Sequence, residues 1–252
     1  MILYFSATGN GKYIAEQIAE KTDEKCMSIV DCICEDKYCF SNEKIFGMVV
    51  PTYFWRLPRI VAEYLGKLRI ENCGYTFFLT SYGATTGEAG SMAKKIMAHN
   101  GQNFDAYYSV IMPDTWTPVF DLTNKNRVDK WLSDGKKQLK LVIGNIMSKR
   151  KGNFIDRKLP KWVTAISAAY MYATERKTKN LSVNKDMCVG CGICVKKCPV
   201  GAMQMKDGCP VWKAEECEMC LGCLHRCPKF AISYGNGKTD RHGQYKNPYT
   251  RI

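Results

Sequence analysis

Eight cysteines in the last third of the chain are spaced for metal chemistry. Cysteines 188, 191, 194 and 198 follow the pattern C-x2-C-x2-C-x3-C-P, which returns 29 positions later. In such a run the first three thiolates bind one iron–sulfur cubane, and the fourth binds the cubane of the other run. The sequence therefore predicts two [4Fe-4S] clusters. The expected ligands are Cys188, Cys191, Cys194 and Cys227 for one cluster, and Cys198, Cys217, Cys220 and Cys223 for the other.

The two runs are similar beyond their ligands. Ala202-Met203 and Ala231-Ile232 stand at the same offset from the two prolines. Structural zinc is the alternative, but zinc ribbons use two C-x2-C pairs and not four staged thiols that end in Cys-Pro. The segment from about 180 to 235 closely resembles bacterial dicluster ferredoxins. This resemblance implies one-electron transfer at low potential, with two short hairpins and two small helices around the clusters.

The rest of the chain must contain a second domain. At 252 residues the chain is too long for a ferredoxin alone, so a domain of about 150 residues and a connector are expected. The sequence starts without the basic segment and the cleavable apolar segment of a signal peptide. We therefore expect a cytoplasmic protein, whose cysteines are kept in a reducing environment. A third metal site at Cys32, Cys34 and Cys39 is the alternative to free thiols there, although its spacing matches no common site. The cysteines expected to be free thiols are Cys26, Cys32, Cys34, Cys39, Cys73 and Cys209.

The chain is basic, since 37 Lys and Arg residues exceed 24 Asp and Glu residues to give a formal net charge of +13. A basic surface attracts acidic protein partners or an anionic substrate. Nucleic acid is disfavoured, because the lysines are spread along the chain without a recognition motif. The apolar stretch 162–173 is too short for a transmembrane segment, which takes about 20 residues. We expect it to pack between domains, and a membrane-surface or partner-docking face is the alternative.

The first residues predict a strand, a loop and a helix. Strand 1–5 leads into Ser6-Ala-Thr-Gly-Asn-Gly-Lys12, and apolar residues then recur with helical spacing over 14–19. A Walker loop is disfavoured, because Ser6 replaces its first glycine and Tyr13 replaces the hydroxyl that binds magnesium. A Ser/Thr turn that caps the helix is a further alternative.

This loop resembles the phosphate loop of flavodoxins, [ST]-x-[ST]-G-[NT]-[ST], at Ser6, Thr8, Gly9 and Asn10. Hydroxyl and backbone N–H groups at a helix N-terminus bind a phosphate without needing a cation. The sequence departs from the pattern at Gly11, where flavodoxins usually have another hydroxyl. Lys12 could compensate for that loss.

The remaining pattern alternates strands and helices. Strands are expected at 26–31, 45–51, 75–80 and 107–112, and helices at about 57–68, 87–100 and 127–147. Together with strand 1–5 they resemble the flavodoxin fold, an α/β doubly wound parallel sheet of five strands in the order 2-1-3-4-5.

Ligands of such sheets bind beyond the carboxyl ends of the strands, near the switch point between the first and third. Loops 51–58 and 81–87 leave the sheet there and carry aromatic residues that could flank a flat isoalloxazine ring. Packing of these aromatics under the loops is the alternative. The expected cofactor contacts are Ser6, Thr8, Gly9, Asn10, Gly11, Lys12, Thr52, Tyr53, Phe54, Trp55, Ser81, Tyr82 and Gly83.

Taken whole, the chain resembles the anaerobe family that fuses an N-terminal flavodoxin-like domain to a C-terminal dicluster ferredoxin. Pro51-x-Tyr53, Leu57-Pro58 and Met112-Pro113-Asp114 look like signatures of that family. The resemblance implies a flavodoxin-like FMN-binding domain at 1–150, a helical connector at 151–180 and a ferredoxin domain at 181–236. We assign no chemistry to the tail at 237–252.

The implied function is electron transfer, in which the chain relays single electrons between two [4Fe-4S] clusters and a bound FMN and docks to redox partner proteins. One alternative is a flavin-dependent reductase of a small substrate, with a proton donor such as Tyr82 or Tyr53. Another is a redox sensor with structural clusters. No histidine lies in a nucleophilic context, and His225 is expected to be a solvated neighbour of a cluster.

Overall fold

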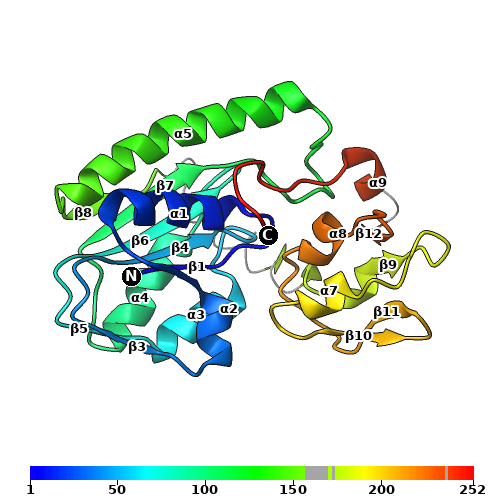
Figure 1. Ribbon diagram of the computed structural model, residues 1–252, viewed down its shortest axis with the longest axis horizontal. Helices are drawn as coiled ribbons and strands as arrows, with labels where there is room; N and C mark the ends of the chain where they lie inside the picture. The colour runs from blue at the N-terminus through cyan, green and yellow to red at the C-terminus, as the bar shows by residue number, and fades with distance from the viewer. Residues whose placement is uncertain (157–169, 172–173, 236–237) are drawn as a thin grey trace.

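The computed structural model describes residues 1–156, 170–171, 174–235 and 238–252. Figure 1 shows an α/β sheet unit and, beside it, a smaller unit that carries the eight predicted cluster cysteines. The expected connector helix at 162–173 lies almost wholly outside the described residues.

A six-stranded parallel sheet forms the centre of the larger unit. Its strand order is β2-β1-β4-β6-β7-β8, so the predicted order of five strands is confirmed and β8 adds a sixth at the edge. The sheet therefore extends past the boundary expected at residue 150. The strands are β1 Ile2–Tyr4, β2 Cys26–Ser28, β4 Phe46–Pro51, β6 Thr76–Tyr82, β7 Ala106–Ile111 and β8 Gly152–Phe154.

The second strand is shorter than predicted. The sequence indicated a strand over 26–31, but helix α2, Ile29–Cys34, begins within that range. The reason is a cap: the Ser28 hydroxyl accepts a hydrogen bond from the backbone N–H of Val30 at 3.1 Å, which starts the helix.

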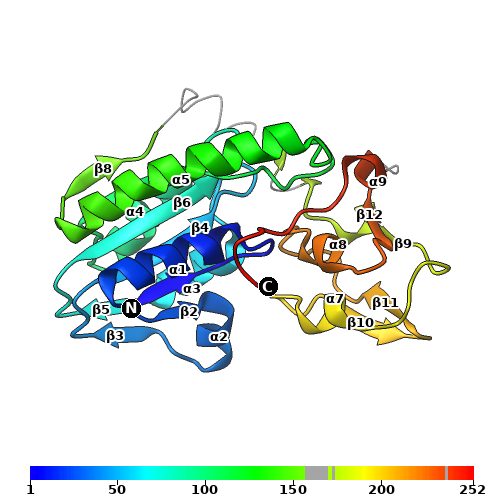
Figure 2. The same cartoon turned by 45° about the horizontal axis from the view of Figure 1, so that its top comes forward.

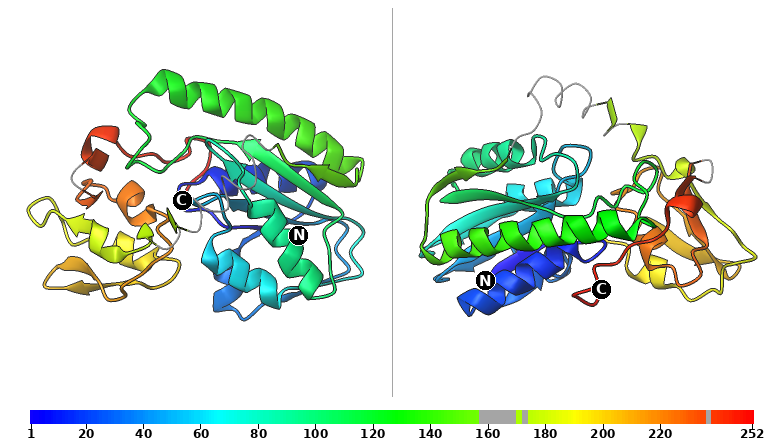
Figure 3. Two further views of the ribbon diagram at one scale, coloured as in Figure 1. Left: turned by 180° about the vertical axis from the view of Figure 1, so that it is seen from behind. Right: turned by 90° about the horizontal axis from the view of Figure 1, so that it is seen from above.

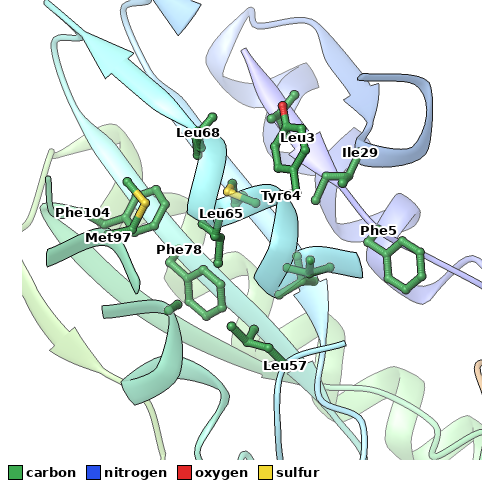
Figure 4. Close-up of a cluster of buried hydrophobic side chains, with 14 of the residues drawn as sticks. Leu3, Phe5, Ile29, Leu57, Tyr64, Leu65, Leu68, Phe78, Met97 and Phe104 are labelled. Atoms are coloured by element: carbon green, nitrogen blue, oxygen red, sulfur yellow. The ribbon is translucent and has the colours of Figure 1, made fainter. Parts of the chain in front are cut away.

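Helices cover both faces of the sheet (Figures 1 and 2). α1 (Asn10–Thr22) and α5 (Lys125–Met147) lie on one face, and α2, α3 (Arg59–Lys67) and α4 (Ala89–His99) lie on the other. All seven residues of β6 are buried, as expected of a central parallel strand. Figure 4 shows the core on the α3 face, where Tyr64, Leu65, Phe78 and Met97 pack together. A short parallel pair, β3 (Cys39–Ser41) and β5 (Arg69–Glu71), flanks this face.

The cysteine-rich unit is built from short elements. β10 (Met203–Lys206) and β11 (Cys209–Trp212) form a hairpin, whereas β9 (Leu181–Val183) pairs with β12 (Ile232–Tyr234) from the other end of the unit. The two expected hairpins are thus one hairpin and one long-range pair. Helices α7 (Ile193–Lys196) and α8 (Gly222–Arg226) are the two predicted small helices. A 3₁₀ turn, Thr178–Asn180, precedes the unit, and α9, Lys238–His242, follows it.

Two buried polar side chains fasten this unit to the sheet domain. The Glu218 carboxylate accepts hydrogen bonds from the backbone N–H groups of Arg59 and Ile60, in the first turn of α3. That helix follows Pro58, which provides no side-chain cap. Glu218 therefore caps α3 from the other unit.

His225 makes the second connection. Its Nδ1 accepts from the backbone N–H of Tyr245 at 3.2 Å, so its Nε2 donates to the Thr115 carbonyl at 2.9 Å. Burial lowers the pKa of His225 to about 4, which keeps the ring neutral. The side chain is fully buried, and the expectation of a solvated His225 is wrong.

The space around Gly47 and Gly144 predicts opposite effects on the free energy of unfolding when each is replaced by alanine. A Cβ at Gly47 on β4 would lie 2.2 Å from the Phe77 ring, so Gly47→Ala should lower the free energy of unfolding, by about 1–3 kcal/mol. Gly144→Ala is the matched control in α5, where a Cβ meets open space, and it should raise that free energy by up to about 1 kcal/mol. Denaturant unfolding followed by circular dichroism measures both. Equal midpoints for Gly47→Ala and wild type would contradict the described contact.

Candidate functional site

One cavity of about 250 Å³ lies between the sheet domain and the cysteine-rich unit. Three loops at the carboxyl ends of the strands form most of its wall: residues 6–11 after β1, 51–55 after β4 and 81–85 after β6. Residues of the loop after β7, within 112–120, also line it, as do Met171 and, from the cysteine-rich unit, Met219, Cys220 and Leu221. The cavity thus occupies the place where doubly wound sheets bind ligands.

Most of the predicted cofactor contacts line this cavity, but Gly9 and Lys12 do not. The Lys12 ammonium donates to the Arg251 carbonyl at 2.6 Å and lies 3.5 Å from the Glu16 carboxylate. The structure therefore does not bring Lys12 to the site, and the suggestion that it compensates for Gly11 is wrong. The predicted residues that line the cavity are Ser6, Thr8, Asn10, Gly11, Thr52, Tyr53, Phe54, Trp55, Ser81, Tyr82 and Gly83.

The predicted phosphate loop runs into the first turn of α1, which begins at Asn10. The N-cap residue is Gly9, with φ +97°, so the alternative of a Ser or Thr cap is not what this helix uses. The first N–H groups of the helix, together with the positive end of its dipole, suit an anion. A Cβ at Gly11 would lie 2.8 Å from the Phe5 carbonyl oxygen. This close approach explains why the chain has glycine where flavodoxins usually have a hydroxyl.

The loop after β4 contains a strained turn. Tyr53 and Arg56 exchange backbone hydrogen bonds of 2.9 and 2.8 Å around Phe54 and Trp55, which have φ +47° and +60°. Such a type I′ turn usually has Asn or Gly at its centre. Two large residues there cost on the order of 1–3 kcal/mol each, and such strain is concentrated at functional sites. The turn brings both aromatic side chains to the cavity wall.

The Phe54 ring also joins the two units. Its centroid is 4.8 Å from that of Trp116, which in turn lies 5.0 Å from the ring of Tyr234 on β12. Both contacts are edge-on, a favourable aromatic arrangement. Phe54 and Trp116 thereby pack against the core of the cysteine-rich unit.

Asp114 was not predicted as a site residue, although it belongs to the Met-Pro-Asp signature after β7. Among the described residues that line the cavity, it is the only one with a carboxylate or a basic group. One carboxylate oxygen accepts from the backbone N–H of Trp116 at 3.0 Å, and a Cβ at Gly83 would lie 2.2 Å from the Asp114 Cβ. Burial raises the pKa of Asp114 to about 6. The cavity wall therefore contains a carboxyl group whose pKa lies closer to neutrality than that of an ordinary aspartate. Other lining residues that were not predicted as cofactor contacts include Met112, Pro113, Thr115, Trp116, Val119, Phe120 and Met171.

Arg226 supplies the positive charge beside the phosphate loop. Its Nη2 donates to the Ser6 carbonyl and its Nη1 to the Lys197 carbonyl, each at 3.4 Å. A Cβ at Gly222 would lie 2.8 Å from Arg226 Nη1, 3.5 Å from Cys220 Sγ and 3.6 Å from the Ala7 Cβ. The guanidinium thus contacts the loop, and its charge favours the thiolate form of Cys220, a predicted cluster ligand. No sequence pattern pointed to it, because the contact joins residues more than 200 positions apart.

The eight predicted cluster cysteines surround two small cavities, four at each. Each group combines three thiols of one run with the fourth thiol of the other, as the spacing predicts. We name them the proximal group, which shares Cys220 with the large cavity, and the distal group. The proximal group is Cys198, Cys217, Cys220 and Cys223, and the distal group is Cys188, Cys191, Cys194 and Cys227.

The surroundings of these thiols fit iron–sulfur clusters. Backbone N–H groups of Ala202, Met219 and Ala231 each approach a cysteine sulfur at 3.3 Å, and such donors favour the thiolate form. Four thiols line each of the two spaces, which is the number of ligands that a [4Fe-4S] cluster takes.

The other six cysteines do not form a site. Cys32 is fully buried in α2, whereas Cys34 and Cys39 are exposed, so the structure does not bring these three together. None of the fourteen cysteines is in a disulfide.

Over the described ranges, the helices are too short or too polar to span a bilayer.

Comparisons with known proteins divide the chain in the same way. A flavodoxin-domain family model matches residues 1–140, and a 4Fe-4S binding domain model matches residues 181–204. An uncharacterised ferredoxin of Methanocaldococcus jannaschii is 39% identical over 61 residues, which are 23% of this chain and 34% of that protein. A ferredoxin of Pyrobaculum islandicum is 30% identical over 66 residues, 25% of this chain and 60% of its own. The chain thus spans less than two thirds of the length of these curated relatives.

Solved structures similar to the chain include flavoproteins. Two-electron reduced Megasphaera elsdenii flavodoxin is 16% identical, with a TM-score of 0.33 over 44% of this chain and 83% of its own. The Trp repressor binding protein of Bacillus subtilis is 13% identical, with a TM-score of 0.36 over 60% of this chain and 100% of its own. Rubredoxin oxygen:oxidoreductase from the anaerobe Desulfovibrio gigas is 16% identical, with a TM-score of 0.34 over 56% of this chain and 35% of its own.

The domain matches give FMN and 4Fe-4S clusters as the cofactors of this chain. The flavodoxin-domain model covers more than half of the 252 residues, and the chain therefore belongs to the flavodoxin domain family, joined here to a 4Fe-4S ferredoxin unit.

Proposed function

We propose that the chain relays single electrons between a redox partner and a bound FMN, using the distal cysteine group on the partner's side and the proximal group on the flavin's side. When bound, the two clusters exchange one electron each, whereas the flavin holds up to two. The observation that carries this order is the place of Cys220, which lines both the proximal cavity and the large cavity.

The residues around Cys220 hold that wall in position. Glu218 binds the first turn of α3, and His225 binds the Thr115 carbonyl in the loop after β7. Both side chains are buried, so their hydrogen bonds are shielded from water. A shared wall shortens the distance between a cluster at the proximal group and a flavin in the large cavity, and it excludes solvent from between them.

The distal group faces outward. Cys191 is exposed, and the neighbouring Val189 and Ile193 are 58% and 39% exposed. The loop between β9 and α7 that carries Cys191 projects at the end of the molecule away from the sheet (Figures 1 and 3). A partner protein therefore reaches the distal group directly, whereas the proximal group lies against the sheet domain.

The large cavity suits an FMN in one orientation. Ser6, Thr8 and the first turn of α1 would hold the phosphate, with the charge of Arg226 behind them. Phe54, Trp55 and Tyr82 would supply flat walls for the ring system. A dedicated reductase with Tyr82 or Tyr53 as proton donor is less well supported, because burial raises the pKa of both phenols and they release protons less readily.

A thiol that is bound to a cluster is protected from alkylation. Because each fourth ligand comes from the other run, the assignment predicts which thiols become reactive when one ligand is replaced. In Cys198→Ser, cysteines 217, 220 and 223 should react with iodoacetamide under anaerobic native conditions, while the distal group stays protected. In Cys227→Ser, cysteines 188, 191 and 194 should react instead and the proximal group should stay protected, because each fourth ligand belongs to the other run. Peptide mass spectrometry and iron content measure the result. Cys209→Ser is the control and should retain both clusters. Alkylation of the distal group in Cys198→Ser would disprove the assignment.

The proposed phosphate site predicts that FMN binds much more tightly than riboflavin, since hydrogen bonds to a phosphate are charge-assisted. Thr8→Val keeps the shape and removes one donor, so the dissociation constant of FMN should rise roughly tenfold while that of riboflavin stays unchanged. Thr85→Val, in the loop after β6, is the control within the same cavity. Fluorescence titration of anaerobically reconstituted protein measures both constants. Equal binding of the two flavins by the wild type would refute a phosphate site at this loop.

A further inference from the structure

Residues 243–252, to which the sequence analysis assigned no chemistry, return from the cysteine-rich unit to the sheet domain. We name them the return segment. Figures 1 and 2 show it running from α9 to the start of α1. Its first part is bonded to the cluster-binding unit: the Gln244 amide donates to the carbonyls of Leu224 and Cys227 at 2.6 and 2.8 Å, and the Tyr245 N–H donates to His225. The segment is thus anchored on α8.

The middle of the return segment binds the phosphate loop. The Asn247 backbone N–H donates to the Thr8 carbonyl at 2.8 Å, and its side-chain Nδ2 donates to Asn10 Oδ1 at 3.0 Å. The Tyr245 hydroxyl donates to the same Asn10 oxygen at 2.8 Å. Asn10 in turn donates to the Pro113 carbonyl at 3.1 Å. All three side chains are at least nine-tenths buried, so these bonds form a closed polar network.

Steric fit supports the same contact. A Cβ at Gly9 would lie 2.9 Å from the Asn247 Cβ and 3.1 Å from Thr250 and Ile252. The return segment therefore packs directly on the loop, but none of its residues lines the cavity. It supports the loop from behind and leaves the cavity side open.

The last part of the segment is fastened to α1 and α5. The Thr250 hydroxyl donates to the Glu16 carboxylate at 2.6 Å, and the Tyr249 ring lies 5.4 Å from that of Tyr13. The Lys136 ammonium of α5 lies 3.6 Å from the centre of the Tyr249 ring. These contacts hold the segment in place on both sides of the phosphate loop.

We propose that Tyr245 and Asn247 are positioning residues for the FMN phosphate, which act by holding Thr8 and Asn10 in the shape that presents the loop's N–H and hydroxyl groups. A loop with glycine at positions 9 and 11 has a large conformational freedom when unsupported. Ordering it in advance lowers the entropic cost of binding. Because the segment is also bonded to α8, the phosphate site depends on the docked cysteine-rich unit. This inference rests on the proposed phosphate site.

The test compares FMN and riboflavin binding in full-length protein with its clusters in place. In the double variant Tyr245→Phe/Asn247→Ala, which loses both bonds to Asn10 Oδ1, the dissociation constant of FMN should rise on the order of tenfold. The constant for riboflavin should not change, because that ligand has no phosphate. Thr250→Val is the matched control: it keeps the side-chain volume beside Gly9 and removes only the hydrogen bond to Glu16 of α1, which involves neither Thr8 nor Asn10. It should keep the wild-type ratio of the two constants. Iron content verifies that each variant retains its clusters.

The possible results separate this inference from the proposed function. A wild type that prefers FMN, with an unchanged ratio in the double variant, overturns the positioning role and leaves the phosphate site standing. An equal loss of affinity for both flavins also overturns it, because the segment would then shape the whole cavity. No preference in the wild type overturns the phosphate site and this inference together. If the double variant loses its iron, Tyr245→Phe alone keeps the ring volume and should lower the FMN preference by a smaller factor.

Discussion

The structure depends on the buried contact that places Cys220 in the wall of the large cavity. A buried carboxylate without partners would be strongly unfavourable, so Glu218 is tolerated only where the N–H groups of α3 meet it. The neutral His225 is held between Thr115 and Tyr245 in the same directional way. Apolar contacts alone would allow the two units to slide against each other. These hydrogen bonds select one arrangement.

Electrostatics follow from the same contact. FMN and the clusters are anionic, and the chain has a formal net charge of +13. The Lys12 ammonium binds the Arg251 carbonyl, whereas the Arg226 guanidinium of the cysteine-rich unit donates to the Ser6 carbonyl in the predicted phosphate loop. The charge of Arg226 also favours the thiolate form of Cys220, a predicted cluster ligand. Docking of the units therefore brings this positive charge to the proposed phosphate site.

The sequence predicted the parts that local geometry determines. Cysteines at fixed spacing can be assigned because a short loop must wrap a cluster, and the predicted phosphate loop is contiguous from Ser6 to Lys12. The turn at Phe54 and Trp55 could not be predicted, because neither residue type favours positive φ. β8 and the return segment also escaped prediction. Their positions depend on contacts with distant residues such as Asp105 and Asn10, which leave no periodic pattern in the sequence.

The most direct test of the relay is the rate of flavin reduction by a protein donor. Anaerobic stopped-flow mixing with excess reduced ferredoxin follows flavin and cluster absorbance in the wild type and in Cys198→Ser, with FMN bound in both. We expect the flavin to be reduced together with the clusters in the wild type. In Cys198→Ser we expect much slower flavin reduction, although the distal group still accepts an electron. Equal rates of flavin reduction in the two proteins would show that electrons bypass the proximal group, and would contradict the account.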